Sequence, residues 1–535
     1  MEARYAISLV LEAHLPFVRE FNKEDDLSIA NEEIRFFEYI TETLLPLLEV
    51  LDRLENDHIP FRFALAMSPV LCYMLGDEYF LNKYLAYLDK QIEFGEQEME
   101  RTAGQEELYK LTQHYYNQLV DRRIVFAVRY EKNLLKVFDY YRRRGKIEIL
   151  ASCATHAFLP FISNSPESIQ AQMEIPISGY RKLFGSCPQG FWLPALGWTP
   201  AVETYFRAYN FSYTIVDSHG LLSGNPAPEK GCFYPVKTPK GIFVLGRDFY
   251  AMREIEKLAN DEVYRSNDRD AGYELPPEMV SQFLSPEGER RRTGYKYHAR
   301  QTAGLNSDDE NAVYDLKAAF NKADEHARLF LEKTIIRLEE ASKHMEEAPI
   351  CVCALNADNF GRCWYEGPHF LETLFRMACG YRDFLFTTPS EYIYKQDIAS
   401  IQVVSPEFSS SGINGYGETW LDVSNDWIYR HLARSMERMT ELAERFPDDT
   451  GLKERALNQA AREILLAQSS DWPSMLYTQD STEYARFHAE NALRNFTTIY
   501  EALGSNYMST EWLTTIERRH NIFPNINYRV FRRKK

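Results

Sequence analysis

Short runs of branched and aromatic residues recur along the first 400 residues of the chain, and segments in which apolar residues follow helical spacing separate them. Runs of this length and composition are typical of buried β-strands. The alternation of strand and helix predicts a parallel α/β sheet, and its length favours a barrel over an open sheet. The expected strands cover residues 5–11, 61–67, 147–151, 211–216, 241–245 and 350–354.

Two regions depart from this alternation. Residues 76–145 form one long charged stretch with helical periodicity, so we expect a helical insertion domain there. From residue 404 the strand pattern stops, and residues 404–535 are expected to form an all-helical C-terminal domain. Its amphipathic helices are expected near residues 428–442, 452–468 and 482–503.

The remaining segments, residues 1–75 and 146–403, are assigned to the barrel. Residues 218–232 and 405–417 are rich in proline, glycine or serine, and we expect both to be loops. We found no internal repeat and no low-complexity segment.

Composition excludes some classes of partner and some cellular locations. Among 535 residues, 61 Lys and Arg stand against 78 Asp and Glu, a net charge of −17 that argues against nucleic acid as a partner. The eight cysteines are scattered, mostly in apolar runs, which is typical of reduced thiols in a cytoplasmic protein. No apolar stretch reaches the roughly 18 residues of a membrane span, and no targeting segment is evident. We therefore expect a cytoplasmic protein with no membrane partner.

The residues that end the predicted strands carry the candidate chemistry, because active sites of parallel α/β barrels lie at the carboxyl ends of the strands. Histidines, acids and tryptophans gather at these ends. Aromatic faces stack on pyranose rings, and carboxylates and imidazoles hydrogen-bond to hydroxyls. The pattern therefore predicts a sugar pocket. The residues at these ends include His14, His156, Trp192, Asp217, Arg247, Asp248, Asn356 and Asp358.

Six segments in chain order resemble motifs of glycoside hydrolase family 57, and in particular of its 4-α-glucan branching enzymes. The segments read AHLPF, ATHAFLP, WLP, NFGRCWYEG, ETWLDVSNDWIYRHL and LAQSSDW, and the resemblance covers essentially the whole chain. It implies a (β/α)7 barrel with a helical insertion and a helical C-terminal domain that closes over the groove. It also implies retaining α-glucan chemistry with no metal or other cofactor.

Retaining chemistry requires a carboxylate nucleophile and a second carboxyl group as acid/base, about 5 to 5.5 Å apart. The resemblance places Ala195 at the nucleophile position and Asn356 at the acid/base position. A methyl group cannot attack an anomeric carbon, and a carboxamide cannot shuttle a proton near neutral pH. The resemblance therefore implies a homologue that has lost glycosyl transfer.

Other positions also depart from the family. Glu12 and Arg362 stand where the family has histidines, and we expect them to form an ion pair that fills the vacated site. Lys230 stands where branching enzymes carry a loop tyrosine, and Glu256 lies near the position of a family tryptophan.

The expected partner is an α-glucan or maltooligosaccharide. Packing between domains is the simpler role for Trp420, Trp427 and Trp472, and a pocket hydrogen bond is the simpler role for each candidate histidine. The candidate substrate-binding residues are His14, His156, Trp192, Arg247, Asp248, Asp358, Trp420, Trp427, Asp471 and Trp472.

Two alternatives stay open. The protein is an active branching enzyme or α-amylase if Asp358, Asp217 or Asp248 replaces the missing carboxylates. Otherwise, the groove binds nothing and the protein acts through a surface partner. The spacing of Glu12 and His14 is too weak a signal to predict a metal site.

Overall fold

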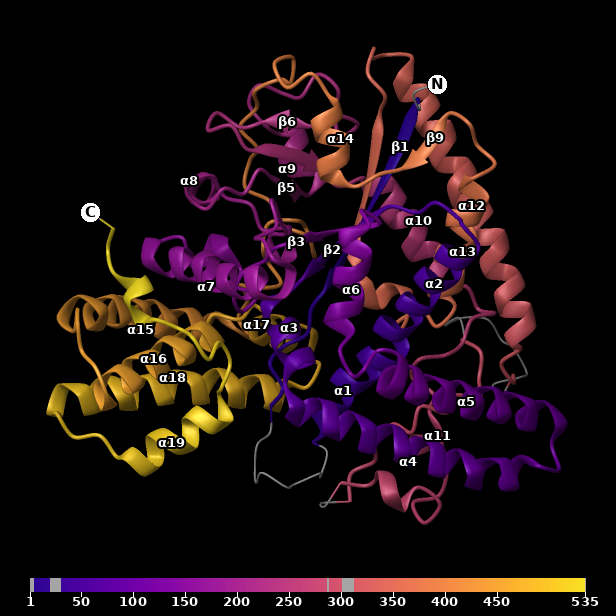
Figure 1. Cartoon of the computed structure of the whole chain (residues 1–535), viewed down its shortest axis with the longest axis horizontal. Coiled ribbons are helices and arrows are strands. Elements are labelled where there is room, and N and C mark those ends of the chain that lie inside the picture. Colours follow the sequence, from indigo (N-terminus) through magenta and orange to yellow (C-terminus); the bar gives the residue numbers. More distant parts are fainter. Residues whose placement is uncertain (1–3, 20–29, 286–287, 301–311, 535) are drawn as a thin grey trace.

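The protein combines a barrel with two groups of helices, shown in Figure 1. The computed structural model describes residues 4–19, 30–285, 288–300 and 312–534.

The first sheet is parallel and contains the N-terminal strand at its centre. Strand β1 (Tyr5–Ala13) lies between β2 (Phe63–Met67) and β8 (Ile350–Asn356), and β3 (Ile147–Leu150) pairs with the far edge of β2. The first sheet therefore runs in the order β3, β2, β1, β8.

The second sheet supplies the other strands of the barrel. Strand β4 (Gly190–Phe191) pairs in parallel with β5 (Tyr213–Val216), and β5 pairs in parallel with β7 (Phe243–Gly246). Strand β6 (Val236–Lys237) adds an antiparallel edge to β7, and β9 (Phe384–Phe386) pairs with the start of β1.

Two contacts close the ring. Ala151 forms a parallel bridge with Phe191, which joins β3 to β4. The backbone N–H of Asp248, just after β7, donates to the carbonyl of Val352 in β8 at 2.8 Å. Seven parallel strands thus close in the order β8, β1, β2, β3, β4, β5, β7. The predicted (β/α)7 barrel is confirmed.

The apolar runs fill both faces of this barrel because successive side chains of a strand point to opposite sides. In β1, Ala6 and Val10 join the cluster inside the barrel, and Ile7, Leu9 and Leu11 join the larger cluster between the barrel and its helices. Both faces of the strands are buried, which explains why the sequence shows continuous apolar runs rather than alternation.

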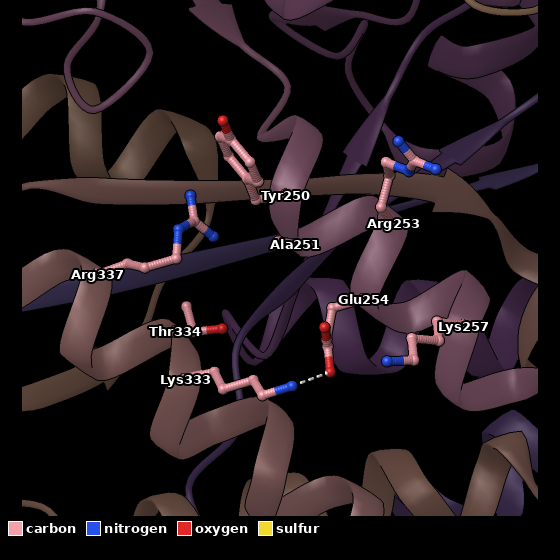
Figure 2. A pocket seen from close by; sticks show the side chains of 8 residues that line it. All are labelled: Tyr250, Ala251, Arg253, Glu254, Lys257, Lys333, Thr334 and Arg337. Carbon is pink, nitrogen blue, oxygen red and sulfur yellow. Dashed lines mark hydrogen bonds and ion pairs between the residues drawn. The ribbon is translucent and has the colours of Figure 1, made fainter.

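Helices cover the outside of the barrel, and several begin with a proline in the first turn or with a capping side chain. A pocket opens between α10 (Phe249–Ala259) and α12 (Leu316–Ser342), which contact each other and β8 (Figure 2). The helices of this layer are α1 (Asn31–Tyr39), α2 (Leu45–Asn56), α3 (Pro69–Gly76), α7 (Pro166–Phe184), α8 (Glu203–Ala208), α10 (Phe249–Ala259), α12 (Leu316–Ser342), α13 (Gly367–Ala378) and α14 (Pro389–Lys395).

The proposed insertion contains α4 (Glu78–Thr102), α5 (Glu106–Ile124) and α6 (Leu134–Arg143), and no strand is assigned between residues 76 and 145, all of which are described. A segment between β7 and β8 packs against these helices. The Tyr297 hydroxyl donates to Glu98 at 2.8 Å, and the Tyr115 hydroxyl donates to the carbonyl of Lys296 at 2.8 Å. Residues between β7 and β8, which the sequence assigned to the barrel, therefore pack against the insertion. The boundaries of the insertion remain predictions.

The C-terminal region is helical. Figure 1 shows its helices on one side of the barrel and α4 and α5 on the other. Within the described ranges, none of the helices is both long and apolar enough to cross a membrane. The helices here are α15 (Asp426–Arg445), α16 (Leu452–Ala467), α17 (Asp471–Thr478), α18 (Thr482–Ser505) and α19 (Thr510–Arg519).

One predicted loop is partly helical. Residues 218–232 were expected to be a loop, but they begin with the short helix α9 (Ser218–Leu222). Its N-cap is Asp217, whose carboxylate accepts from the backbone N–H of Ser218 at 2.7 Å. An aspartate that accepts from a free backbone N–H at the start of a helix stabilises that helix.

Trp192 is a filler of the barrel interior, since it is 3% exposed and packs with the inner cluster. We predict that Trp192→Ala lowers the free energy of unfolding by about 3–5 kcal/mol, because it empties a large volume in a closed core. Trp427→Ala, at a half-buried tryptophan of α15, is the matched control and should cost clearly less. Equal shifts of the thermal unfolding midpoint in the two variants would contradict the assignment.

Candidate functional site

The carboxyl ends of β1 and β8 lie side by side at the mouth of the barrel. The parallel register pairs Glu12 with Asn356. Both residues share the strand face of Val10 and Ala354, which point into the barrel. Adjacent strands lie about 4.8 Å apart. Glu12 is therefore the direct neighbour of Asn356 on the next strand.

The Glu12 carboxylate binds a histidine from the β3 end of the barrel. Its Oε1 lies 2.7 Å from His156 Nε2, and His156 Nδ1 lies 2.8 Å from Ser470 Oγ. Burial alone would lower the pKa of His156, but the charge and hydrogen bond of Glu12 outweigh burial and raise it. This contact favours an imidazolium paired with a carboxylate.

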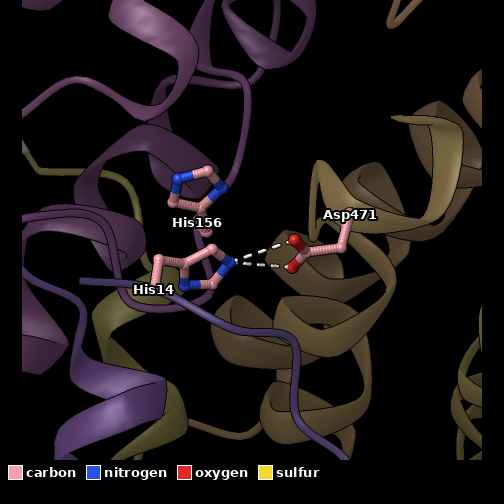
Figure 3. Close-up of side chains that lie close together, drawn as sticks. All are labelled: His14, His156 and Asp471. Atoms are coloured by element: carbon pink, nitrogen blue, oxygen red, sulfur yellow. Dashed lines mark hydrogen bonds and ion pairs between the residues drawn. The ribbon is translucent and has the colours of Figure 1, made fainter. Parts of the chain in front are cut away.

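A second histidine stacks on the first (Figure 3). The rings of His14 and His156 lie 3.7 Å apart with an angle of 8° between their planes. His14 Nε2 lies 3.0 Å from Asp471 at the start of α17, and His14 Nδ1 lies 2.9 Å from Ser68 Oγ. Burial opposes the charge of Asp471, but His14 and neighbouring groups lower the pKa of Asp471 to about 2.

This cluster, which we call the histidine pair and its carboxylates, comprises Glu12, His14, His156 and Asp471. It joins β1 and the segment after β3 to the C-terminal helices. His14, His156 and Asp471 each offer a ligand atom within 4.8 Å of the others. However, both nitrogens of each ring already have a hydrogen-bond partner. A metal ion would have to displace some of these bonds, whereas a sugar hydroxyl could exchange into the network.

Ala195 lies on a tight turn after β4. Its φ of 54° and ψ of 23° are left-handed values, which cost a residue with a Cβ about 1–3 kcal/mol. Its carbonyl accepts from Ser411 N at 2.7 Å and from Ser411 Oγ at 2.9 Å. Ser411, which sequence reasoning missed, holds this strained turn from the segment that leads to the C-terminal helices.

The expected ion pair between Glu12 and Arg362 is wrong. Arg362 pairs with Asp358 at 2.7 Å, because the two lie four residues apart in one turn. Glu12 is held by His156 instead. Sequence reasoning missed this alternative because the partner of Glu12 lies 144 positions away.

The two other acids at strand ends are also bound to cations. Asp217 pairs with Arg247 and caps α9. Asp248 is 2.5 Å from Arg337 through one oxygen, and its other oxygen accepts from the backbone N–H of Ala251 in α10. Both acids are thus engaged in contacts that hold the barrel and its helices together.

Two of the four candidate tryptophans are buried among other side chains. Trp192 fills the barrel, and Trp472 is 2% exposed, donates from Nε1 to the carbonyl of Leu466 at 2.7 Å and stacks on His488. Neither offers a face to a ligand. Trp420 is 8% exposed and stacks on Phe158 at 4.8 Å. Trp427 is half-buried.

Lys230 and Glu256, the two remaining departures from the family, are not part of the histidine pair and its carboxylates. Lys230 pairs with Glu347 at 2.5 Å and lies over the ring of Tyr234, so it is held against the barrel. Glu256 is exposed on α10.

We predict that Glu12→Gln lowers the pKa of His156, because the variant removes the negative charge that raises it. A raised pKa contributes stability below the unfolded-state value of about 6.5 and loses it as pH rises through the folded-state value. The wild-type unfolding midpoint should therefore fall on going from acid to alkaline pH more than that of Glu12→Gln. NMR titration of the His156 ring measures its pKa. The resonances of the exposed His344 should be the same in the wild type and in Glu12→Gln, which makes His344 the control. An unchanged His156 titration would contradict the contact.

The chain matches two family models. One, described as glycosyl hydrolase family 57, matches residues 8–404, and the other, described as 1,4-alpha-glucan branching enzyme, C-terminal, matches residues 431–531. A curated relative, the 1,4-alpha-glucan branching enzyme of Thermococcus kodakarensis, is 24% identical over 97% of this chain and 77% of its own length.

Solved structures agree. The α-amylase AmyC from Thermotoga maritima superposes with a TM-score of 0.92 at 32% identity, and the match covers 100% of both chains. The Thermococcus branching enzyme, solved in complex with glucose and additives, has the same fold, with a TM-score of 0.86 at 22% identity over 100% of this chain and 97% of its own. Because the first family model spans more than half of the sequence, the chain belongs to glycosyl hydrolase family 57.

Proposed function

We propose that this protein is a catalytically inactive member of its family that keeps a branching-enzyme scaffold and binds an α-glucan or maltooligosaccharide at the mouth of the barrel. The observation that carries the proposal is the pair Ala195 and Asn356 at the two positions where the family motifs place carboxyl groups. Loss of a nucleophile alone lowers the rate about a millionfold in a hydrolase with a covalent intermediate. Here the acid/base is absent as well.

The neighbourhood of these two positions supports the proposal. Ala195 presents a methyl group on a strained turn that Ser411 holds. Asn356 is exposed at the mouth, with Glu12 beside it. The Glu12 carboxylate is bound to His156.

Sugar binding is supported by the polar groups that remain. The histidine pair and its carboxylates offer several donors and acceptors, and each ring is about one-tenth exposed. Such convergent polar groups fix the orientation of a hydroxyl-rich ligand. The Thermococcus relative, described as a complex with glucose, is a protein of the same fold.

A second candidate is an active 4-α-glucan branching enzyme or α-amylase that uses relocated carboxylates. The register of Glu12 with Asn356 favours it, because Glu12 places a carboxylate one strand away from the acid/base position. Asp358 lies in the turn after β8, although Arg362 holds it. Asp217 and Asp248 are weaker replacements, since both cap helices and pair with arginines.

An iodine-stain branching assay on amylose separates the two candidates. We predict that the wild-type protein forms no α-1,6 branches above a buffer blank, because it lacks both carboxyl groups. The Thermococcus branching enzyme serves as the positive control. Branching by the wild type that disappears in Glu12→Gln or Asp358→Asn would establish the second candidate instead.

Isothermal titration with maltoheptaose tests the binding half of the proposal. We predict measurable heat, and Trp427→Ala should weaken binding about threefold to tenfold if its half-exposed ring stacks on a glucosyl unit. Trp512→Ala changes a half-buried tryptophan of α19 and is the matched control. Absence of heat from folded wild-type protein would show that the groove binds no glucan and would favour a surface partner.

A further inference from the structure

The pocket between α10 and α12 lies outside the barrel and takes no part in the proposed glucan site. Its cavity measures about 490 Å³, within the range of small-molecule sites. One wall is a single face of α10, with Tyr250, Arg253, Glu254 and Lys257 at helical spacing. The other wall is α12, which contributes Lys333, Thr334 and Arg337.

Positive charge exceeds negative charge in this pocket. Four cations line it, and two acids oppose them: Glu254 within the pocket and Asp248 at its edge. Lys333 is 2.6 Å from Glu254, and Arg337 is 2.5 Å from Asp248. Among the described residues, Arg253 and Lys257 have no carboxylate within 4.0 Å. Two cations are therefore left over.

This local excess matters although the whole chain carries a net charge of −17. Charges beyond about 8–10 Å are largely screened at physiological ionic strength. An anion in the pocket therefore responds to the cations that line it. A surplus of two charges matches a phosphate monoester, which carries about −1.5 to −2 at neutral pH.

The arrangement of the side chains suits such a group. Figure 2 shows the amino groups of Lys257 and Lys333 reaching toward Glu254 from opposite sides, and the guanidinium of Arg337 lies on the side of Tyr250. Lysine and arginine are the usual phosphate ligands. The hydroxyl of Thr334 is not available to a ligand, because it donates to the carbonyl of Phe330 within α12 at 2.8 Å.

An aromatic ring stands at the edge of the same cavity. Tyr250 is 70% exposed, and the guanidinium of Arg337 lies 5.2 Å from its ring centre. A large exposed aromatic face beside a cation is typical of a platform for a ring-shaped ligand. The cavity has room for more than a phosphate group alone.

From this juxtaposition, we propose that the pocket between α10 and α12 binds a phosphorylated small molecule, with its phosphate taking the place of the Glu254 carboxylate between Lys257 and Lys333 and its ring against Tyr250, beside Arg337. A sugar phosphate and a nucleotide share this chemistry. The site is independent of the glucan groove, so neither proposal depends on the other.

Isothermal titration of the full-length protein with glucose 6-phosphate, AMP and inorganic phosphate tests the proposal, and glucose and adenosine are the neutral controls. We predict that at least one organic phosphate binds and that the neutral compounds do not. Lys257→Gln combined with Lys333→Gln should weaken binding about tenfold or more.

The matched control is Lys110→Gln combined with Lys136→Gln, two exposed lysines of α5 and α6 that each pair with a neighbouring glutamate. It removes the same charge from elements that do not line the pocket and should leave affinity within about twofold. Tyr250→Ala should weaken the organic phosphate and leave inorganic phosphate unchanged. Which organic phosphate binds identifies the ligand class.

Three results would overturn the proposal. The first is that no phosphate compound gives binding heat. The second is that the two double-lysine variants weaken binding equally, and the third is that inorganic phosphate binds as tightly as both organic phosphates. A thermal shift of each variant without ligand checks that it is folded.

Discussion

Two stacked imidazoles at the mouth of the barrel are the contact on which the arrangement of this protein depends. His14 and His156 lie face to face at 3.7 Å, and each points a nitrogen at a different carboxylate. Glu12 from the barrel holds the ring of His156, and Asp471 from the C-terminal helices holds the ring of His14. The same four side chains thus join the two parts of the molecule and line the entrance to the barrel.

This network also explains how the mouth can stay ordered without the catalytic pair of the family. Glu12 takes the hydrogen bond of His156 Nε2, so that nitrogen is not left unsatisfied in a buried place. Ser411 fixes the turn that carries Ala195, although this turn strains a residue with a Cβ. The barrel mouth is therefore ordered around Ala195 and Asn356, the two residues on which the proposed loss of catalysis rests.

Much of the fold could be predicted from the sequence, because strands buried on both faces leave continuous apolar runs. The runs at residues 5–11 and 350–354 correspond to β1 and β8, and the seven-stranded barrel is confirmed. Strands β4, β6 and β9 have two or three residues each, which is too short for any period to show. Helix α9 could not be predicted because it is too short to show helical periodicity. The only signal in the sequence is the aspartate that caps its start.

Residues of the site could be predicted from the sequence, but the contacts between them could not. Strand ends pointed to His14 and His156, yet the bond between His14 and Asp471 joins residues 457 positions apart, and no local pattern encodes such a pair. Arg362 was assigned to the wrong acid, although its partner Asp358 lies only four residues away in the same turn. The burial of Trp472 depends on how the C-terminal helices pack, which periodicity alone does not reveal.

The central claim is that no side chain of this protein captures a glucosyl unit covalently. Mass spectrometry of the intact protein after incubation with a fluorinated maltosyl donor tests it most directly, because such donors accumulate the glycosyl-enzyme intermediate of retaining enzymes. The account predicts an unchanged protein mass under conditions in which the Thermococcus branching enzyme gains one glycosyl unit. A glycosyl adduct on Glu12, Asp358 or any other side chain would contradict it.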